Sequence, residues 1–222
     1  MSRTALSQGT RSRRENMRAL TIEESFGQFV EEPTPDTWNC LRERIICSAA
    51  YDPYSASWHR LDLLIGSGCF EEASRLAKSL EAWACLSPRW HYWMGVSALE
   101  CGDPLLAAGH RAWLGICLDA ILQSGDGTPE SPFRVLYSTD AYDVLQVLGE
   151  VAEGQQLLED ERGCRDVLTA KSGQTYWFDV AEMLARCVAP GREQGSEESL
   201  DRSAAAVGPT GDGGRFTGRA SS

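Results

Sequence analysis

Residues 63–73 read LLIGSGCFEEA, and residues 97–107 read SALECGDPLLA. In each segment a glycine, Gly68 or Gly102, lies five residues before an alanine, and the two segments are offset by 34 residues. Glycine accepts the left-handed conformation that commonly follows the last turn of a helix, and a small residue lets the returning helix pack closely. The two segments therefore predict the turns of two helical hairpins between residues 55 and 122.

A period of 34 residues is that of tetratricopeptide repeats, whose stacked helix pairs present a binding surface. Other residues keep the same offset: the aromatics Trp58 and Tyr92, the apolar pair Leu64 and Ala98, and the pair Leu80 and Leu114. Ala77 and Arg111 depart from the repeat pattern, because an aromatic side chain is usual there. The last helix, 104–122, is apolar almost all round, and we expect it to be sandwiched between the hairpins and the following segment.

The chain divides into four parts by composition. We expect a disordered basic leader at 1–24, a tetratricopeptide-like helical-hairpin region at 25–123, a small α+β element packed on the helices at 124–189, and a disordered tail at 190–222. Strand formers at 133–137, 166–169 and 176–180, with a helix at 139–149, predict a three-stranded β element with one helix. Phe26 and Phe29 predict a short apolar segment before a linker. The fold class is α+β, mostly α.

Charge is distributed unevenly along the chain. Residues 1–18 hold five Arg and one Glu, whereas residues 19–189 hold twelve basic and twenty-six acidic side chains. An acidic body repels phosphate backbones, so nucleic acid is not an expected partner. No apolar run approaches the roughly 18 residues of a membrane span, so no membrane partner is expected either. Met17 is a second possible start, which leaves open whether residues 1–16 belong to the mature protein.

Eight cysteines include no CxxC pair, and most lie in apolar helical patterns. This indicates reduced thiols in a cytoplasmic protein rather than four disulfides. The histidines at 59, 91 and 110 have no partner at a close metal-ligand spacing, so we expect no metal and no other cofactor. Asp126 in SGDGT resembles a ligand loop, but the Lys of a phosphate loop and the distal Glu of a calcium loop are missing, so a structural turn is favoured.

Four short motifs occur in a fixed order: YDPYS at 51–55, SGDG at 124–127, YDVL at 142–145 and YWFDV at 176–180. The set resembles an uncharacterised bacterial domain-of-unknown-function family over roughly residues 25–181. The resemblance implies tetratricopeptide-type helices followed by a small strand-bearing C-terminal element. It implies no activity.

Stacked hairpins place the first helix of each on a concave face. This predicts a groove lined by Trp58, Asp62, Arg89, Tyr92 and Val96, since aromatic and Arg side chains commonly anchor interfaces. The other interpretation, equally weighted, is that Trp58 and Tyr92 belong to the core. The leading hypothesis is a non-enzymatic module that binds a protein or peptide, whose identity the sequence does not give, as it does not give the oligomeric state.

Two alternatives stay open. The first is a small-molecule-binding protein or hydrolase with a site between the helices and the C-terminal strands, near Asp126, Tyr142 and Asp179. The second is an inhibitor-like or immunity-like protein whose acidic surface blocks a basic partner.

Overall fold

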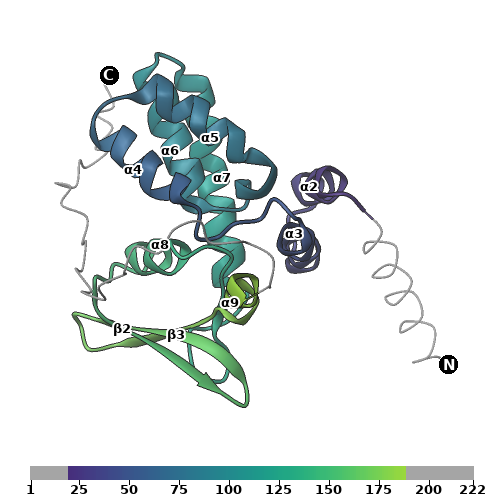
Figure 1. Cartoon of the computed structure of the whole chain (residues 1–222), viewed down its shortest axis with the longest axis vertical. Coiled ribbons are helices and arrows are strands. Elements are labelled where there is room, and N and C mark those ends of the chain that lie inside the picture. The colour runs from purple at the N-terminus through teal and green to yellow at the C-terminus, as the bar shows by residue number, and fades with distance from the viewer. Residues whose placement is uncertain (1–19, 189–222) are drawn as a thin grey trace, which may run out of the picture. The chain divides into compact units, whose positions relative to one another are not determined.

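The structure of the chain is a computed structural model that describes residues 20–188. Within this range it holds eight α-helices and a four-stranded mixed sheet (Figure 1). The predicted class, α+β and mostly α, is confirmed. The leader and tail that the sequence predicts to be disordered lie outside the described residues, apart from positions 20–24, of which 22–24 belong to helix α2 (Ile22–Glu31).

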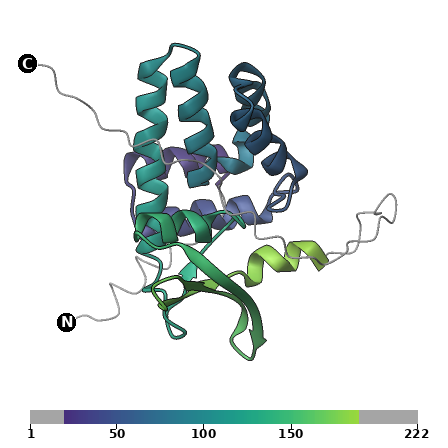
Figure 2. The ribbon, with the colours of Figure 1, turned by 90° about the vertical axis from the view of Figure 1, so that its left-hand side faces the viewer.

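Two helical hairpins form the upper part of the described region, and their helices run side by side in Figure 2. The first hairpin is α4 (Ala56–Gly66) with α5 (Phe70–Ala84), and the second is α6 (Pro88–Glu100) with α7 (Pro104–Leu122). Gly68 has a φ of 72° and Gly102 a φ of 83°. The residue after each glycine donates its N–H to the carbonyl five positions earlier, at 2.9 Å in the first turn and 2.8 Å in the second. The two predicted turns are therefore built alike.

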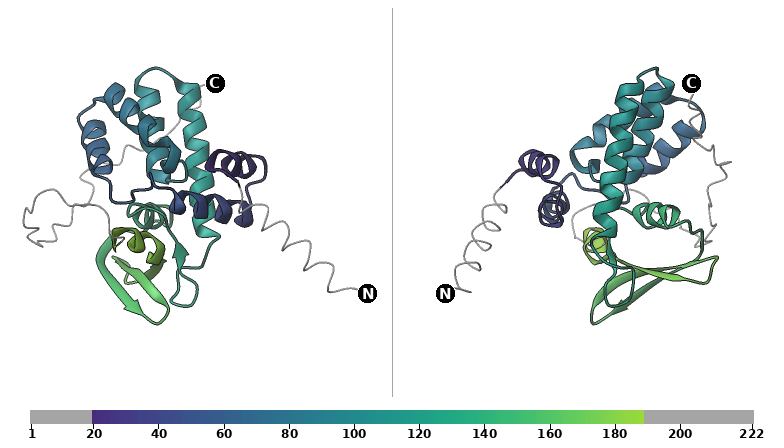
Figure 3. Two further views of the ribbon diagram at one scale, coloured as in Figure 1. Left: turned by 45° about the vertical axis from the view of Figure 1, so that its right-hand side comes forward. Right: turned by 180° about the vertical axis from the view of Figure 1, so that it is seen from behind.

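The apolar segment around Phe26 and Phe29 forms the helix α2, and the following linker is reduced to residues 32–34. Thr21 and Glu24 form a reciprocal capping box that starts α2, and α3 (Pro35–Cys47) follows almost at once. Phe26 stacks on Trp113 of α7 with ring centroids 5.2 Å apart, and Phe29 is buried. These contacts place α2 against α7 (Figure 3).

The sheet has the strand order β1-β4-β3-β2, so the predicted three-stranded element is wrong by one strand. Strand β1 (Phe133–Arg134) pairs in parallel with β4 (Thr175–Asp179), while β3 (Gly163–Ala170) pairs antiparallel with β4 and with β2 (Ala152–Asp160). The unpredicted strand, β2, reads AEGQQLLED and is exposed over most of its length. Its pairing with β3 makes it a strand, because its composition does not favour one.

Helix α8 (Asp140–Val147) lies between the hairpins and the sheet, and α9 (Ala181–Val188) follows β4 (Figure 1). One core joins these parts. Tyr51 and Tyr137 lie at its centre: the Tyr51 hydroxyl donates to the Leu136 carbonyl, and the Tyr137 hydroxyl donates to the Trp83 carbonyl. The helical and strand-bearing parts are therefore tied by buried hydrogen bonds as well as by apolar packing.

Helix α7 is sandwiched only in part: its C-terminal half packs on α6, α8 and β1, whereas residues 104–112 are mostly exposed. Only Cys117, Leu118 and Ile121 of its nineteen residues are buried. Among the described residues it is the one helix long and apolar enough to cross a membrane by length and composition alone, and 17% of the 18-residue window that meets this test is buried. A core helix of a soluble protein would have most of that window buried, and α7 does not.

Candidate functional site

The five residues of the predicted groove lie on α4 and α6, the first helices of the two hairpins. Asp62 lies close enough to Arg89 to affect its titration: burial lowers the pKa of Arg89, but Asp143 and Asp62 outweigh burial and raise it overall. Helices α4 and α6 pack against each other, and Asp62 lies on α4 while Arg89, Tyr92 and Val96 lie on α6. We call these four residues the α4/α6 face.

Trp58 does not belong to the exposed part of this face. Its side chain is 7% exposed, and its ring lies 5.4 Å from Trp83, 5.5 Å from Trp93 and 5.4 Å from Tyr137, centroid to centroid. Tyr137 comes from the segment between β1 and α8, so a distant part of the chain closes over the indole. Trp58 is a core residue, as the second interpretation of the sequence has it.

Arg89 is held by α8. Its guanidinium donates from Nε to Asp143 Oδ1 at 2.9 Å, and a second nitrogen binds the same oxygen. Burial raises the pKa of Asp143, and Arg89 opposes this shift. Arg89 is therefore engaged in joining the second hairpin to α8, and the charge it offers to a partner is largely neutralised.

The remaining groove residues are available to a partner. Tyr92 is 48% exposed, Asp62 is exposed and Val96 is half-buried. Leu99, one further turn along α6, is 42% exposed. Because positions 92, 96 and 99 follow helical spacing, the three side chains form one apolar stripe on α6.

Asp140 lies at the start of α8, and its side chain is buried. Its Oδ2 accepts the N–H groups of Leu136 at 2.9 Å and Tyr137 at 3.0 Å, and its other oxygen is buried without a hydrogen-bond partner among the described residues. Burial raises the pKa of Asp140 to about 8. The carboxyl group fixes the chain reversal before α8.

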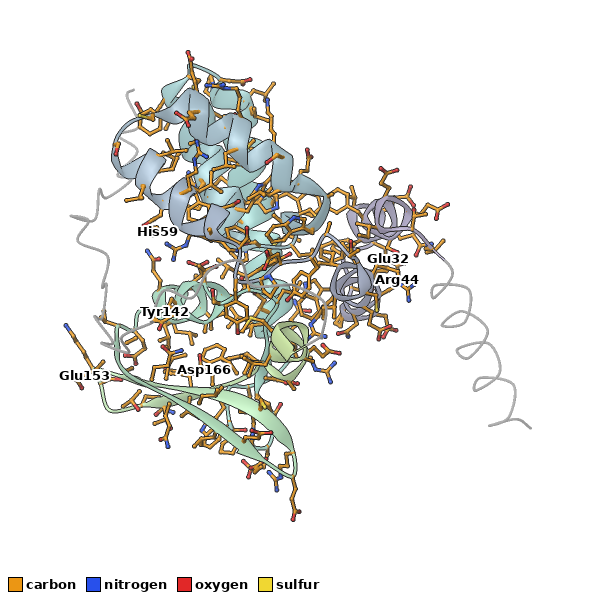
Figure 4. The ribbon with its side chains drawn as sticks, in the orientation of Figure 1. Glu32, Arg44, His59, Tyr142, Glu153 and Asp166 are labelled. Atoms are coloured by element: carbon orange, nitrogen blue, oxygen red, sulfur yellow. The ribbon has the colours of Figure 1, made fainter. Side chains whose placement is uncertain are left out.

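The three residues of the alternative site bind separate partners. Tyr142 donates to Gln155 at 2.6 Å, and Gln155 in turn donates to Asp166 at 2.6 Å, so α8 is linked to β2 and β3 (Figure 4). Asp126 accepts from the Thr128 backbone and hydroxyl within its own turn. Asp179 accepts from the N–H of residue 181 at the start of α9.

Asp166 is the last residue in the hydrogen-bonded series Tyr142–Gln155–Asp166, and nothing in the sequence indicated it as a site residue. Burial raises its pKa, and one of its oxygens is buried without a hydrogen-bond partner among the described residues. Figure 4 shows Tyr142 and Asp166 on the side of α8 and the sheet away from α9. A carboxylate in the alternating pattern of a strand gives no sequence signal of its own.

Two histidines lie together, but they do not form a metal site with other side chains of the described residues. His91 and His110 contact each other through their Nδ1 atoms at 3.1 Å, and His91 Nε2 donates to the Cys85 carbonyl at 2.9 Å. Within residues 20–188 no group of three or more His, Cys, Asp or Glu side chains is placed to hold a metal ion. The seven cysteines from Cys40 to Cys164 are free thiols.

Two surface hollows are lined by other residues. A hollow of about 450 Å³ lies between the two hairpin turns, with Cys69 and Cys101 among its lining residues, and a smaller one of about 360 Å³ is lined by Ile46, Cys47, Glu182 and Ala185. Neither is lined by a residue of the α4/α6 face, so this face is an exposed surface of the two helices and not one of these hollows.

Comparisons with protein-family models, curated proteins and solved structures find no match for this chain. The resemblance to an uncharacterised bacterial family and the tetratricopeptide-like character of the hairpins therefore stay predictions. What stands is a chain with two helical hairpins of matched turn geometry and a small mixed sheet.

Proposed function

We propose that this chain is a non-enzymatic, cytoplasmic protein-binding module that uses the α4/α6 face. The observation that carries the proposal is the apolar stripe of Tyr92, Val96 and Leu99 on α6, in which Tyr92 and Leu99 are exposed, together with the exposed Asp62 on the adjacent helix α4. Tyrosine buries a large area at a low cost in side-chain entropy and is enriched among residues that anchor interfaces.

The hairpins would present this face in the manner of tetratricopeptide repeats, as the shared 34-residue offset and the matched glycine turns suggest. Arg89 would act as a support, since its charge is already bound to Asp143. The chemistry of the face favours a partner segment that carries a basic side chain for Asp62 next to apolar side chains for the stripe.

A site-specific photochemical cross-link tests the proposal in the full-length chain. Tyr92 is replaced by the photoreactive p-benzoylphenylalanine, and the same probe is placed at Lys78, an exposed position of α5, as the matched control. We expect a discrete adduct with one protein or peptide at position 92 and none at position 78.

The Asp62→Ala substitution in the probe-bearing chain sharpens this test. If a basic side chain meets Asp62, the yield of the adduct should fall, and raising the salt concentration should lower the yield with Asp62 present. No adduct at position 92, or the same adducts at both positions, would overturn the proposal. The small-molecule or hydrolase alternative stays a prediction, because Asp126, Tyr142 and Asp179 each bind a different partner within the fold.

A further inference from the structure

Strand β2 lies at an edge of the sheet. The strand order β1-β4-β3-β2 gives it one neighbouring strand, β3, and it runs for nine residues. An edge strand presents unpaired backbone N–H and C=O groups, and proteins commonly protect such an edge with proline, with lysine or with a covering segment. Residues 152–160 contain neither proline nor lysine, and the irregularity in their pairing lies at the beginning, between Ala152 and Gly154. The rest of this edge is regular.

The hydrogen bonds of β3 show which backbone groups of β2 point away from the sheet. The Cys164 carbonyl accepts the N–H of Val180, just after β4, at 3.1 Å, so Cys164 turns its backbone groups away from β2. Glu159 lies opposite Cys164 and therefore turns its own N–H and C=O away from β3. The alternation of the antiparallel ladder extends this to Leu157 and Gln155. None of these outward groups bonds to another element within residues 20–188.

The side chains of the same three residues lie on the core-facing side of the sheet. Gln155 lies opposite Leu168, which is fully buried. Because successive side chains of a strand alternate, Leu157 and Glu159 share the face of Gln155. Leu157 is nevertheless 57% exposed, and Tyr142, which donates to Gln155, is 41% exposed. A strand added beside β2 would cover Leu157 and extend the core-facing side of the sheet.

The charge of this edge indicates which strand it accepts. Residues 150–161 hold five acidic side chains and no basic one. Asp160 is bound by Arg165, whereas Glu159 is exposed and forms no ion pair with another residue of the described range. Opposite charges that lie directly across from each other on neighbouring strands attract, and like charges repel. A lysine or arginine opposite Glu159 therefore complements the edge, and an acidic side chain does not.

We propose that β2 binds an extended segment of a partner protein, which joins the sheet as an additional strand and carries an apolar side chain opposite Leu157 and a basic one opposite Glu159. In strand addition, main-chain hydrogen bonds give affinity and alternate side chains give specificity. The outward backbone groups of Gln155, Leu157 and Glu159 supply the hydrogen bonds. Leu157 and Glu159 are alternate residues on one face, so they select the two side chains. This surface belongs to the sheet and is separate from the α4/α6 face.

A second copy of this chain is the other occupant that an open edge suggests, and the charges disfavour it. Two β2 strands side by side would bring together two segments that each hold five acidic side chains and no basic one. The formal net charge of the whole chain is -11, so two copies also repel each other at longer range.

Amide hydrogen exchange, measured by NMR on the full-length chain, tests the proposal. The probe is a synthetic peptide of sequence TKTVTKT with blocked ends, which can place its valine opposite Leu157 and a lysine opposite Glu159 in either strand direction. Without peptide we expect fast exchange at Gln155, Leu157 and Glu159 and slow exchange at Gln156 and Leu158, whose N–H groups point to β3. At about 1 mM, the peptide should slow exchange at the first three residues about tenfold, as a dissociation constant near 0.1 mM gives. The control peptide TETVTET should not.

Substitutions separate the backbone and charge contributions. Leu157→Pro removes an outward N–H and none of the bonds to β3, so it should abolish peptide binding while Gln156 and Leu158 stay protected. Glu159→Lys should raise the dissociation constant of the TKTVTKT peptide about fivefold or more, because a lysine then lies opposite a lysine. Glu71→Lys makes the same change of net charge at an exposed position of α5, and should leave the dissociation constant within about twofold.

Four outcomes would overturn the proposal. The first three are unchanged exchange at Gln155, Leu157 and Glu159 with about 1 mM peptide, equal protection by the two peptides, and equal peptide affinity of Leu157→Pro and the unsubstituted chain. The fourth is protection of the three outward amides that rises with protein concentration in the absence of peptide. That result would assign the edge to a second copy of this chain.

Discussion

The two hairpins share a turn and differ in what surrounds them. Gly68 and Gly102 have the same backbone conformation, and the following residues make the same hydrogen bond. Trp58 and Tyr92 hold matching positions 34 residues apart, yet Trp58 is 7% exposed and Tyr92 is 48% exposed. Residues close in sequence determine the hairpin, whereas the position of the hairpin in the fold decides which of its faces meets water.

The second helices of the two hairpins, α5 and α7, differ in which residues they expose. Helix α5 has a buried inner face with Ala73 and Ala77 and a charged outer side, while α7 has few buried residues and an apolar outer side. Helix α5 of the first hairpin thus has the usual pattern of a helix at a protein surface, with apolar residues on its buried side and charges on its exposed side. The second hairpin has the apolar stripe on α6 and several exposed apolar residues on α7, among them Leu105.

Truncating the matched aromatics should give the largest difference between the hairpins. Trp58→Ala removes an indole packed against Trp83, Trp93 and Tyr137, and should lower the free energy of unfolding by about 3–5 kcal/mol. Tyr92→Ala removes a half-exposed ring and should cost no more than about 1 kcal/mol. Urea denaturation of both variants measures the two values. Equal costs would mean that the two positions are packed alike, against the structure.

The second hairpin should also be the one that responds to acid. Burial lowers the pKa of His91 from 6.5 to about 4, so the folded state binds the proton later than the unfolded chain does. The stabilising contribution of the neutral imidazole is complete above pH 6.5 and is lost as the pH falls from 6.5 through 4, with a loss of up to about 3 kcal/mol.

Denaturation at a series of pH values checks this response, with His91→Gln as the variant and His59→Gln, on the exposed side of α4, as the control. Between pH 6.5 and 4 the free energy of unfolding should fall much less steeply with pH in His91→Gln than in the unsubstituted protein. In His59→Gln it should fall as steeply as in the unsubstituted protein. Asp140 acts in the opposite direction: its pKa is raised to about 8, so its contribution is complete at low pH and is lost as the pH rises towards 8. If the free energy of unfolding of His91→Gln fell with pH as steeply as that of the unsubstituted protein, other groups would have to cause the loss of stability in acid.

Substitution of the two turn glycines should show where the hairpins are the same. Both residues have positive φ, and an added Cβ would meet only Phe70 at 3.8 Å in one turn and nothing within 4 Å in the other. Gly68→Ala and Gly102→Ala should therefore each cost about 1 kcal/mol, the price of a left-handed conformation for an L-residue. Thermal or urea unfolding measures both, and a difference above about 1 kcal/mol would show that the turns are not equivalent.

The smallest effect concerns an ion pair that only the first hairpin has. Arg60 of α4 binds Glu72 of α5 at 2.8 Å with both side chains well exposed, and the matching residues of the second hairpin are Met94 and Leu106. Glu72→Gln should cost about 0.2–1 kcal/mol at low salt. At about 1 M salt the cost should vanish, since exposed charges are then screened. A cost that is the same at both salt concentrations would point to packing of the Glu72 stem instead.

Some helices and strands could be predicted from the sequence pattern, and others could not. The bounds of helix 104–122 follow from a proline at its first position and from its long apolar run, and the structure gives the same bounds. The strands around residues 166–169 and 176–180 follow from their β-branched and aromatic residues. The helix at Ile22–Glu31 and the strand at Ala152–Asp160 did not follow, because a capping box was overlooked in the first and polar residues conceal the second.

The candidate site shows the same division. Helical spacing placed Asp62, Arg89, Tyr92 and Val96 on two first helices, and these helices do pack against each other. Helical spacing did not predict that Tyr137, 79 positions beyond Trp58, packs on the Trp58 indole. It also did not predict that Asp143 binds Arg89. These contacts link parts of the chain that are distant in sequence, and a single sequence carries no local signal for them.

The sequence by itself determined the hairpins, their turns and the mostly helical class, because glycine conformation, proline placement and apolar spacing act within a few residues. Only the tertiary structure decided which aromatic is buried, that an edge strand forms at all, and that the most apolar helix is left largely uncovered. Burial is a property of the surroundings, since the same side chain is stabilised or exposed according to which distant segment packs against it.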